Sequence, residues 1–405
     1  MRAVRPAIFA LGATQVIGYG TCYYAYSILA PAVAREFGVP IEILFAVFSA
    51  ALLVGGLSSP LLGILMDRAG AARLMAYGSL AAAIVLAALA SSPNIYVFAL
   101  LTMVLEVVGV LILYNAAFSA LAQLDGVKAR RAITYLTLIA GFASTLFWPL
   151  TGWLLATIGW RATYLGYAAL HLAMAVPLHL WLRHFTASHR ARSAAQLETA
   201  AVAAAMPTGG TEGGLAFVAV AVSFALSNFV AASFAVHLVS ILQTVGLGAS
   251  AFAVAMVMGP SQVLVRLTDA MFWKGLHPLT VAIIGATSLP LSALCLLLGQ
   301  PDIGAAIAFA ALFGFGQGLE SIVAGTVPLV LFDRKRYGEL LGKLSAARFV
   351  LGAGAPFAFA AMSGFGGLNT ALLVLIAAGT IAIVPLLVLR ARLKSAGRLH
   401  VQPSN

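Results

Sequence analysis

Four ionisable residues lie inside stretches of sequence that are otherwise apolar: Glu106, Arg266, Glu320 and Arg348. A carboxylate in surroundings of low dielectric constant takes up a proton more readily than in water. An arginine stays charged there and binds carboxylates through two parallel hydrogen bonds. We therefore predict that Glu320, with Glu106 as the alternative, binds a proton. Arg348 and Arg266 are predicted to bind an organic anion, unless Arg348 serves only as the structural partner of Glu320.

The neighbours of these charges at helical spacing suggest which of them belong to a polar site. Gln262 lies one turn before Arg266, and we predict that it contacts the same substrate. Asp269 follows Arg266 by three residues, so the two form either a local ion pair or part of that site. Glu106 and Arg348 have no opposite charge within one helical turn, which favours a place in a polar cavity.

Amide and aromatic side chains form a second group of candidate substrate contacts. Most of them share or flank one face of the first apolar stretch, and one further ring lies in the fifth. Such rings suit a flat or aromatic compound, although the same pattern is also typical of helix packing. The predicted contacts of this group are Gln15, Tyr19, Tyr23, Tyr26 and Trp148.

The composition shows what kind of element must hold these residues. The 405-residue chain is 62% hydrophobic and 9% charged, and its mean hydropathy is +1.03. A soluble domain usually has about a quarter of its residues charged. Apolar runs recur along the whole chain, and runs of about 18 residues or more are long enough to cross a bilayer. We therefore predict an all-α polytopic membrane protein.

Twelve membrane-spanning helices are predicted from these runs, six on each side of a polar stretch at 183–213. This division predicts an N-terminal six-helix bundle over 1–182, a cytoplasmic linker over 183–213, and a C-terminal six-helix bundle with a short cytoplasmic tail over 214–405. The predicted helices are 7–34, 41–65, 73–91, 95–122, 132–156, 163–182, 214–242, 250–272, 279–299, 303–332, 340–362 and 368–390.

The two halves share features that indicate a duplicated six-helix unit. The second and fifth predicted helices of each half contain a proline, and the fourth of each half contains Glu106 or Glu320. Transporters are commonly built from such repeats, with the substrate site near the middle of the bilayer. The prolines are Pro60, Pro149, Pro260 and Pro356.

Basic residues set the predicted orientation. They gather in the loops and termini on the side of the N-terminus, whereas only Arg35 and Arg161 fall on the opposite side. Cytoplasmic loops carry the excess of Lys and Arg. We therefore predict that both termini and the 183–213 linker are cytoplasmic. The net charge of +11 follows from this bias and does not indicate nucleic-acid binding.

The loop after the second predicted helix reads GILMDRAGAARLMAYG. It resembles the loop signature of the major facilitator superfamily, in which a glycine is followed by Asp-Arg and then by a second glycine and basic residues. Ala71 and Ala72 stand where the family usually has arginines. The matching residues are Gly63, Asp67, Arg68, Gly70 and Arg73.

The resemblance covers the whole chain at the level of fold. It implies twelve transmembrane helices in two six-helix pseudo-repeats and a central cavity lined by the first and fourth helices of each half. It also implies that the loop Asp and Arg brace helix ends and set the balance between inward and outward states. An Asp at a helix N-terminus meets the positive end of the helix dipole. The arginine pattern is similar to that of the superfamily's organic-anion and monocarboxylate porters.

These observations predict a secondary active transporter, with a small organic anion as substrate and H⁺ as the coupling ion. We expect a monomer in the lipid bilayer of the inner membrane that works by alternating access, as a symporter. Two alternatives stay open: import or export of a neutral or aromatic compound such as a drug or vitamin, and a transporter-like sensor.

Motifs of other function classes do not occur in the sequence. The nucleotide-binding pattern G-x-x-x-x-G-K-[ST] and the catalytic patterns H-E-x-x-H and G-x-S-x-G are missing. We therefore expect neither ATP-driven transport by this chain alone nor an enzyme, and no cofactor or metal.

Overall fold

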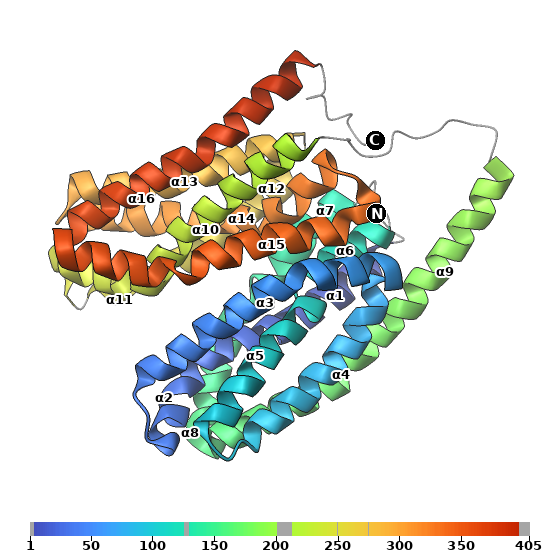
Figure 1. Ribbon diagram of the computed structural model, residues 1–405, viewed down its shortest axis with the longest axis horizontal. Helices are drawn as coiled ribbons and strands as arrows, with labels where there is room; N and C mark the ends of the chain where they lie inside the picture. The colour runs from blue at the N-terminus through green and yellow to red at the C-terminus, as the bar shows by residue number, and fades with distance from the viewer. Residues whose placement is uncertain (1–3, 125–128, 201–212, 249, 274, 397–405) are drawn as a thin grey trace. The chain divides into compact units, whose positions relative to one another are not determined.

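The computed structural model describes residues 4–124, 129–200, 213–248, 250–273 and 275–396, and over 189–200 the course of the backbone alone (Figure 1). These described residues form helices joined by short turns and contain no β-strand. The prediction of an all-helical fold is confirmed. The chain divides into two compact units, each of which is described by itself.

Unit 1 contains the helices drawn in blue to green and one short orange segment (Figure 1). The orange segment is the 3₁₀ turn Arg334–Arg336 with the first part of α15 (Tyr337–Ala353), as far as Ala346. The other helices are α1 (Arg5–Gly18), α2 (Ala25–Phe37), α3 (Ile41–Ala69), α4 (Ala71–Ala90), α5 (Ile95–Ile112), α6 (Tyr114–Leu124), α7 (Ala129–Ala140), α8 (Ala143–Leu170) and α9 (Val176–Ala200).

Two π-helical segments interrupt unit 1. Tyr19–Tyr24 joins α1 to α2, and His171–Ala175 joins α8 to α9. A π-helical turn closes hydrogen bonds to the fifth residue rather than the fourth, so the side chains beyond it are rotated relative to a continuous α-helix.

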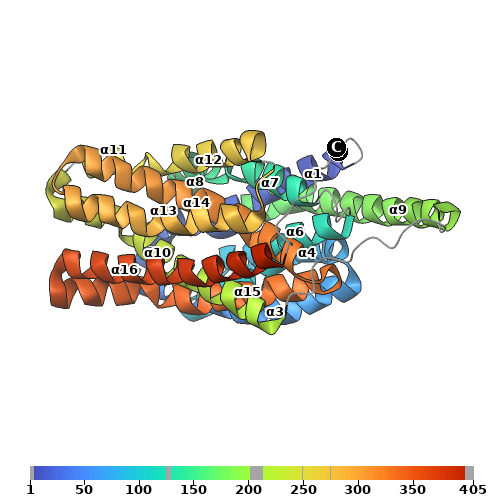
Figure 2. The same ribbon diagram turned by 90° about the horizontal axis from the view of Figure 1, so that it is seen from above.

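Unit 2 contains the remaining part of α15 and the helices drawn in yellow-green to red. Helix α13 packs along α14, and α16 packs on both α10 and α13 (Figure 2). The helices are α10 (Gly214–Leu242), α11 (Ser250–Ala255), α12 (Met258–Phe272), α13 (Pro278–Gly299), α14 (Ile303–Leu331) and α16 (Ala355–Ser395), with a π-helical segment Gln243–Leu247 after α10.

Nine helical stretches of the described residues are long and apolar enough to cross a membrane. Two of them, Ala129–Ser188 and Tyr337–Ser395, have 60 and 59 residues, so each is long enough for two crossings. Each contains a glycine of positive φ, Gly159 in α8 and Gly367 in α16, both at +78°. These glycines divide each stretch into two helices, and the red chain reverses at the second break (Figure 1).

The predicted domain boundaries stay a prediction. Helix α9 continues from the predicted sixth span to Ala200, so the predicted linker begins inside a helix. Residues 201–212 of that linker and residues 397–405 of the predicted tail lie outside the described residues.

Each unit has its own core of aromatic and aliphatic side chains. In unit 1 the rings of Phe98, Trp160 and Tyr164 lie 5.9–6.3 Å apart, centroid to centroid, between α5 and α8. In unit 2 the ring of Phe234 on α10 lies 5.2 Å from that of Phe309 on α14, edge to face. Such ring pairs contribute about 0.5–1.5 kcal/mol beyond their buried area.

A glycine on α14 allows the close helix contact that places the candidate site of unit 2. A side chain at Gly318 would overlap Val265 and the backbone of Gln262 on α12. Small residues let helix backbones approach closely inside membranes, where packing rather than the hydrophobic effect drives association. Glu320, two residues later, therefore lies on another face of α14, toward the cavity that α10, α13 and α16 also line.

Candidate functional site

Glu320 and Arg348 form an ion pair in unit 2, in which Glu320 is buried and the side chain of Arg348 is partly exposed. The Nη2 of Arg348 on α15 donates to the Oε1 of Glu320 on α14 over 2.9 Å. Glu320 is 7% exposed. The backbone carbonyl of Arg348 accepts a hydrogen bond from the Nδ2 of Asn228 on α10, also at 2.9 Å. The pairing considered from the sequence is therefore present, and Asn228 is a contact that the sequence did not single out.

The pair leaves polar atoms that no protein group satisfies. The Oε2 of Glu320 and the Nε of Arg348 are buried without a hydrogen-bond partner. A carboxylate can accept on both oxygens and a guanidinium has five N–H donors, so each residue retains capacity for a further ligand. A buried polar atom of this kind costs about 1–3 kcal/mol unless something binds it.

Arg266 on α12 lies beside the same part of α14. Its Nη2 donates to the Oε1 of Gln262 at 3.3 Å, and its Nε donates to the carbonyl of Gly318 at 3.4 Å. Asp269 is buried one turn further along the helix. The structure thus brings together the predicted residues Gln262 and Arg266 beside Gly318 of α14, whereas Glu320, two residues later, contacts Arg348. Their role as substrate contacts stays a prediction.

Unit 1 contains an aromatic cluster at its first π-helical segment. The ring of Tyr19 lies 4.7 Å from that of Tyr114, and the ring of Tyr24 lies 5.9 Å from that of Trp148, centroid to centroid. Tyr23 packs between Tyr19 and Tyr24. Tyr23 is 37% exposed and Trp148 52%. Tyr24 and Tyr114 were not singled out from the sequence. An α-helical register does not place Tyr24 with Tyr19, whereas the π-helical turn does.

Tyr26 and Gln15 are held by backbone groups, and Tyr26 is linked to this cluster through Phe48, which also packs on Tyr23. The hydroxyl of Tyr26 donates to the carbonyl of Leu44 at 2.7 Å, and its ring stacks on Phe48 at 4.6 Å. The Nε2 of Gln15 donates to the carbonyl of Ile112 at 2.7 Å, while its Oε1 is buried without a partner. These positions favour the packing alternative for Tyr26, and the substrate roles of both residues stay predictions.

Glu106 on α5 is 9% exposed and interacts electrostatically with Tyr23 and Cys22. In the part of the chain that the structure describes, no ion pair or hydrogen bond joins Glu106 to another side chain. The backbone of α3 comes close to Glu106, since a Cβ on Gly55 would lie 3.2 Å from its carbonyl oxygen. Glu106 therefore has no arginine partner like that of Glu320.

The predicted loop signature forms a contact between α3 and the start of α15 within unit 1. The Oδ1 and Oδ2 of Asp67 accept the backbone N–H groups of Gly338 and Glu339, each at 2.8 Å. These are N–H groups of the first helical turn, which have no partner inside the helix. Asp67 thus meets the positive end of a helix dipole, as expected. A side chain at Gly63 would overlap the carbonyl of Gly338.

The other members of the signature are arranged around the turn between α3 and α4. Gly70 has φ +89°, a conformation that side chains other than glycine rarely adopt. Arg68 is exposed, and the guanidinium of Arg73 lies 5.9 Å from the centroid of the Tyr77 ring. Gln123, which the sequence did not single out, closes the turn by bonding the N–H of Ala71 and the carbonyl of Met66.

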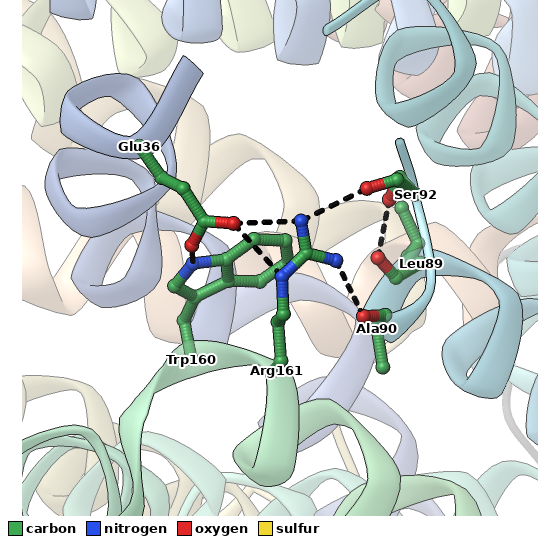
Figure 3. Close-up of polar contacts among 6 residues, drawn as sticks. All are labelled: Glu36, Leu89, Ala90, Ser92, Trp160 and Arg161. Atoms are coloured by element: carbon green, nitrogen blue, oxygen red, sulfur yellow. Dashed lines mark hydrogen bonds and ion pairs between the residues drawn. The ribbon is translucent and has the colours of Figure 1, made fainter. Parts of the chain in front are cut away.

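A charged cluster fastens three helix ends at another place in unit 1 (Figure 3). Arg161 donates to the Oε1 of Glu36 at 2.7 and 2.9 Å and to the carbonyls of Ala90 and Ser92 at 2.6 and 2.9 Å. The indole Nε1 of Trp160 donates to the Oε2 of Glu36 at 2.5 Å. The hydrogen bonds from Arg161 hold the pKa of Glu36 below its usual range.

Two buried histidines, also missed from the sequence, hold the region around the second π-helical segment. The Nε2 of His171 lies 2.8 Å from the hydroxyl of Thr21. His179 bridges Ser79 on α4 and Thr14 on α1, at 2.6 and 2.9 Å. Isolated histidines in apolar sequence give no signal of their distant hydroxyl partners. Among the described residues, no group of three or more His, Cys, Asp or Glu is arranged to hold a metal ion.

Comparisons with known proteins give a consistent result. The family model of the Major Facilitator Superfamily matches residues 12–286. The structure is similar to that of the human organic anion transporter MFSD10 (TETRAN), with a TM-score of 0.72 and 14% identity over 95% of this chain and 99% of that one. No curated protein sequence matches significantly.

Two further structures are similar, and both have the same family fold. The proton:xylose symporter XylE, bound to 6-bromo-6-deoxy-D-glucose, has a TM-score of 0.67 and 15% identity over 93% of this chain and 94% of that one. FucP in its outward conformation has a TM-score of 0.63 and 13% identity over 94% and 98%. At these identities the likeness concerns the fold.

Proposed function

Because this chain belongs to the Major Facilitator Superfamily, we propose that it is a secondary active transporter of a small organic anion in the inner membrane. The observation that carries the proposal is the ion pair of Arg348 with the buried Glu320, which lies among apolar helices. An intramembrane charge pair is costly and marks a substrate or ion pathway. The members of the superfamily with similar structures are transporters rather than enzymes.

We propose twelve membrane-spanning helices in two six-helix halves with both termini cytoplasmic. The nine apolar stretches support this count, because two of them are divided at Gly159 and Gly367. A further crossing is proposed for residues 7–34, within the helical segment Arg5–Phe37, whose π-helical interruption leaves α1 and α2 each shorter than one crossing. The loop bias in Lys and Arg supports the orientation.

Arg348 is proposed as the anion-binding group. Its guanidinium stays protonated, and its Nε is buried without a partner. An anion that bound there would compete with Glu320 for the same cation. The fold similarity to a human organic anion transporter is in keeping with this substrate class.

Glu320 is proposed as the proton acceptor, with Glu106 as the alternative. Release of Arg348 to an anion would leave the Glu320 carboxylate buried without its counter-ion, and protonation removes that cost. Binding of the anion and of the proton would therefore favour each other. Asp67 and its contact with α15 are proposed to set the balance between the states of the alternating-access cycle.

A second candidate function rests on the aromatic cluster. Tyr19, Tyr23, Tyr24, Tyr114 and Trp148 offer ring faces for stacking. A flat neutral compound would be stabilised by these rings without any need for Arg348. Transport of such a compound, unaffected by substitution of Arg348, would favour this alternative. Binding without uptake would indicate a sensor.

The test is uptake of organic and aromatic acids into proteoliposomes under an imposed pH gradient. We expect Arg348→Lys to lose most transport, because a point charge does not reproduce the planar fork of guanidinium. Arg131→Lys is the matched control, since Arg131 is exposed and contacts Tyr135 on its own helix. Glu320→Gln should keep substrate binding but lose the dependence on the gradient. Normal transport by Arg348→Lys, or a cationic best substrate, would contradict the proposal.

A further inference from the structure

A small cavity lies beside Glu320, inside unit 2. Its volume is about 10 Å³, and four helices enclose it: α10, α13, α14 and α16. A space of this size holds about one water-sized particle. Arg348 does not line the cavity. The cavity is therefore distinct from the place where the guanidinium meets the carboxylate.

Oxygen atoms from three of these helices surround the cavity. Ser223 and Ser227 on α10 are one helical turn apart and both line it. The hydroxyl of Ser223 is fully buried and has no hydrogen-bond partner, and the Oε2 of Glu320 is likewise buried and unpartnered. Ala286 on α13 also lines the cavity, and residue 290 is a proline, so the carbonyl of Ala286 lacks its usual helical donor.

This set of oxygens is suited to a hard monovalent cation. The lining side chains include one carboxylate and two hydroxyls, and none of them carries a nitrogen atom. The carbonyl of Ala286, which Pro290 leaves without its helical donor, would add a fourth oxygen. Freed backbone carbonyls are also the groups with which transporters coordinate Na⁺. A hydrated ion is too large for the cavity, whereas a bare Na⁺ is smaller than a water molecule and can exchange its hydration shell for these four oxygens.

We propose that this cavity is a Na⁺ site formed by Glu320, Ser223, Ser227 and the carbonyl of Ala286. The carboxylate faces two cations on its two sides, Arg348 at Oε1 and Na⁺ at Oε2. The positive charges repel each other, so Na⁺ binds best when Arg348 has moved to another anion. In that state Na⁺ and the proton of the proposed function compete for the carboxylate of Glu320. This coupling rests on the proposed function, in which the substrate anion binds Arg348. The existence of the Na⁺ site does not depend on it.

The test measures Na⁺ binding without any substrate. The purified full-length protein is heated in NaCl, KCl or choline chloride at equal ionic strength and constant pH, and the shift in Tm is followed as NaCl is titrated. We expect a saturable rise in Tm that Na⁺ produces and that K⁺ and choline do not. An equal rise with all three salts, or none with Na⁺, would overturn the proposal and leave the cavity as a water site.

Variants identify the ligands. Ser223→Ala and Glu320→Gln should lose the Na⁺-dependent shift. Ser292→Ala is the matched control and should keep it, because the hydroxyl of Ser292 is equally buried but is bonded to the carbonyl of Leu289 on its own helix. A shift that persists in Ser223→Ala and in Ser227→Ala would place the ion elsewhere.

Removal of Arg348, the cation that competes with Na⁺ for Glu320, should strengthen Na⁺ binding rather than weaken it. Arg348→Gln should lower the NaCl concentration needed for half of the Tm shift by about tenfold, since the carboxylate then has Na⁺ as its only cation. An unchanged or raised midpoint would contradict the competition. If Arg348→Gln does not fold, the comparison of Ser223→Ala with Ser292→Ala still tests whether the cavity binds Na⁺.

The uptake assay separates failure of this inference from failure of the proposed function. A Na⁺-dependent Tm shift in a protein that transports no organic anion would support the Na⁺ site and contradict the proposed substrate class. Anion uptake that is the same in NaCl and choline chloride, together with no Tm shift, would retain the transporter and reject the Na⁺ site.

Discussion

Substitution of Asp67 by Asn tests the contact between α3 and the start of α15. In the native protein the two carboxylate oxygens accept the N–H groups of Gly338 and Glu339 at 2.8 Å each. An asparagine retains one acceptor oxygen and turns an NH₂ donor toward the second N–H. One charge-assisted hydrogen bond is therefore lost, and the other becomes a neutral one.

The size of the effect follows from these two bonds. A hydrogen bond to a charged group contributes about 1.5–3 kcal/mol and a neutral one about 0.5–1.5 kcal/mol. Loss of one charged bond and weakening of the other by about 1 kcal/mol should together cost about 3 kcal/mol, which corresponds to roughly a 150-fold change in an equilibrium constant. The state that contains this contact becomes less populated by that factor, and transport slows by up to the same amount.

The assay compares initial uptake into proteoliposomes with equilibrium substrate binding to the purified protein. Asp67→Asn should slow uptake and leave binding nearly unchanged. Asp302→Asn is the control, because Asp302 accepts the N–H of Ala305 at the start of α14, at 2.9 Å, outside the loop signature. Loss of binding with an intact fold would place Asp67 in the substrate site, and equal slowing by Asp302→Asn would show a general helix-capping effect; either result refutes the reasoning.

Three further predictions concern other parts of the chain. Glu36→Gln should lower the stability of the folded protein at neutral pH by less than about 1 kcal/mol, because the pair is partly exposed. The pKa of Glu36 is lower in the folded protein, so its contribution to stability is present above the unfolded pKa near 4.5 and is lost as pH falls through the folded pKa. In thermal unfolding, the Tm values of wild type and variant should therefore converge at acid pH. Gly63→Ala should impair transport, because the new methyl group overlaps the carbonyl of Gly338, whereas Gly152→Ala, with open space around it, should not; equal uptake by the two variants would argue against the close contact. Reporter fusions at the C-terminus and within the 183–213 linker should both give cytoplasmic signals, and an external signal from either would contradict the proposed topology.

Features that depend on local sequence were predictable. The apolar runs indicated the helices, and the charges inside them identified Glu320 and Arg348 before their 2.9 Å contact was known. The resemblance to the loop signature implied that Asp67 braces a helix end, and the structure showed that this end is the start of α15. In each case the physical cause, the cost of an unpaired charge or of an unsatisfied N–H group, acts within a few residues.

Features that depend on distant partners were not predictable in the same way. Trp160 and Glu36 are far apart in sequence, and nothing near either residue indicates the contact. His179 finds its hydroxyl partners on two other helices. Tyr24 joins Tyr19 through a π-helical turn, which apolar periodicity at 3.6 residues per turn does not reveal. Tertiary packing, rather than residue type, decides these positions.

The π-helical segment Tyr19–Tyr24 makes the length of the chain a determinant of which side chains face one another. A π-helical turn contains one residue more than the α-helical turn that it replaces, and one residue corresponds to about 100° of helix rotation. If these residues formed a continuous α-helix instead, all of α2 would be turned by that angle. Tyr26 would leave the carbonyl of Leu44, and Glu36 would leave Arg161. The π-helical turn thus accommodates one additional residue in the chain and keeps these contacts of α2 in register.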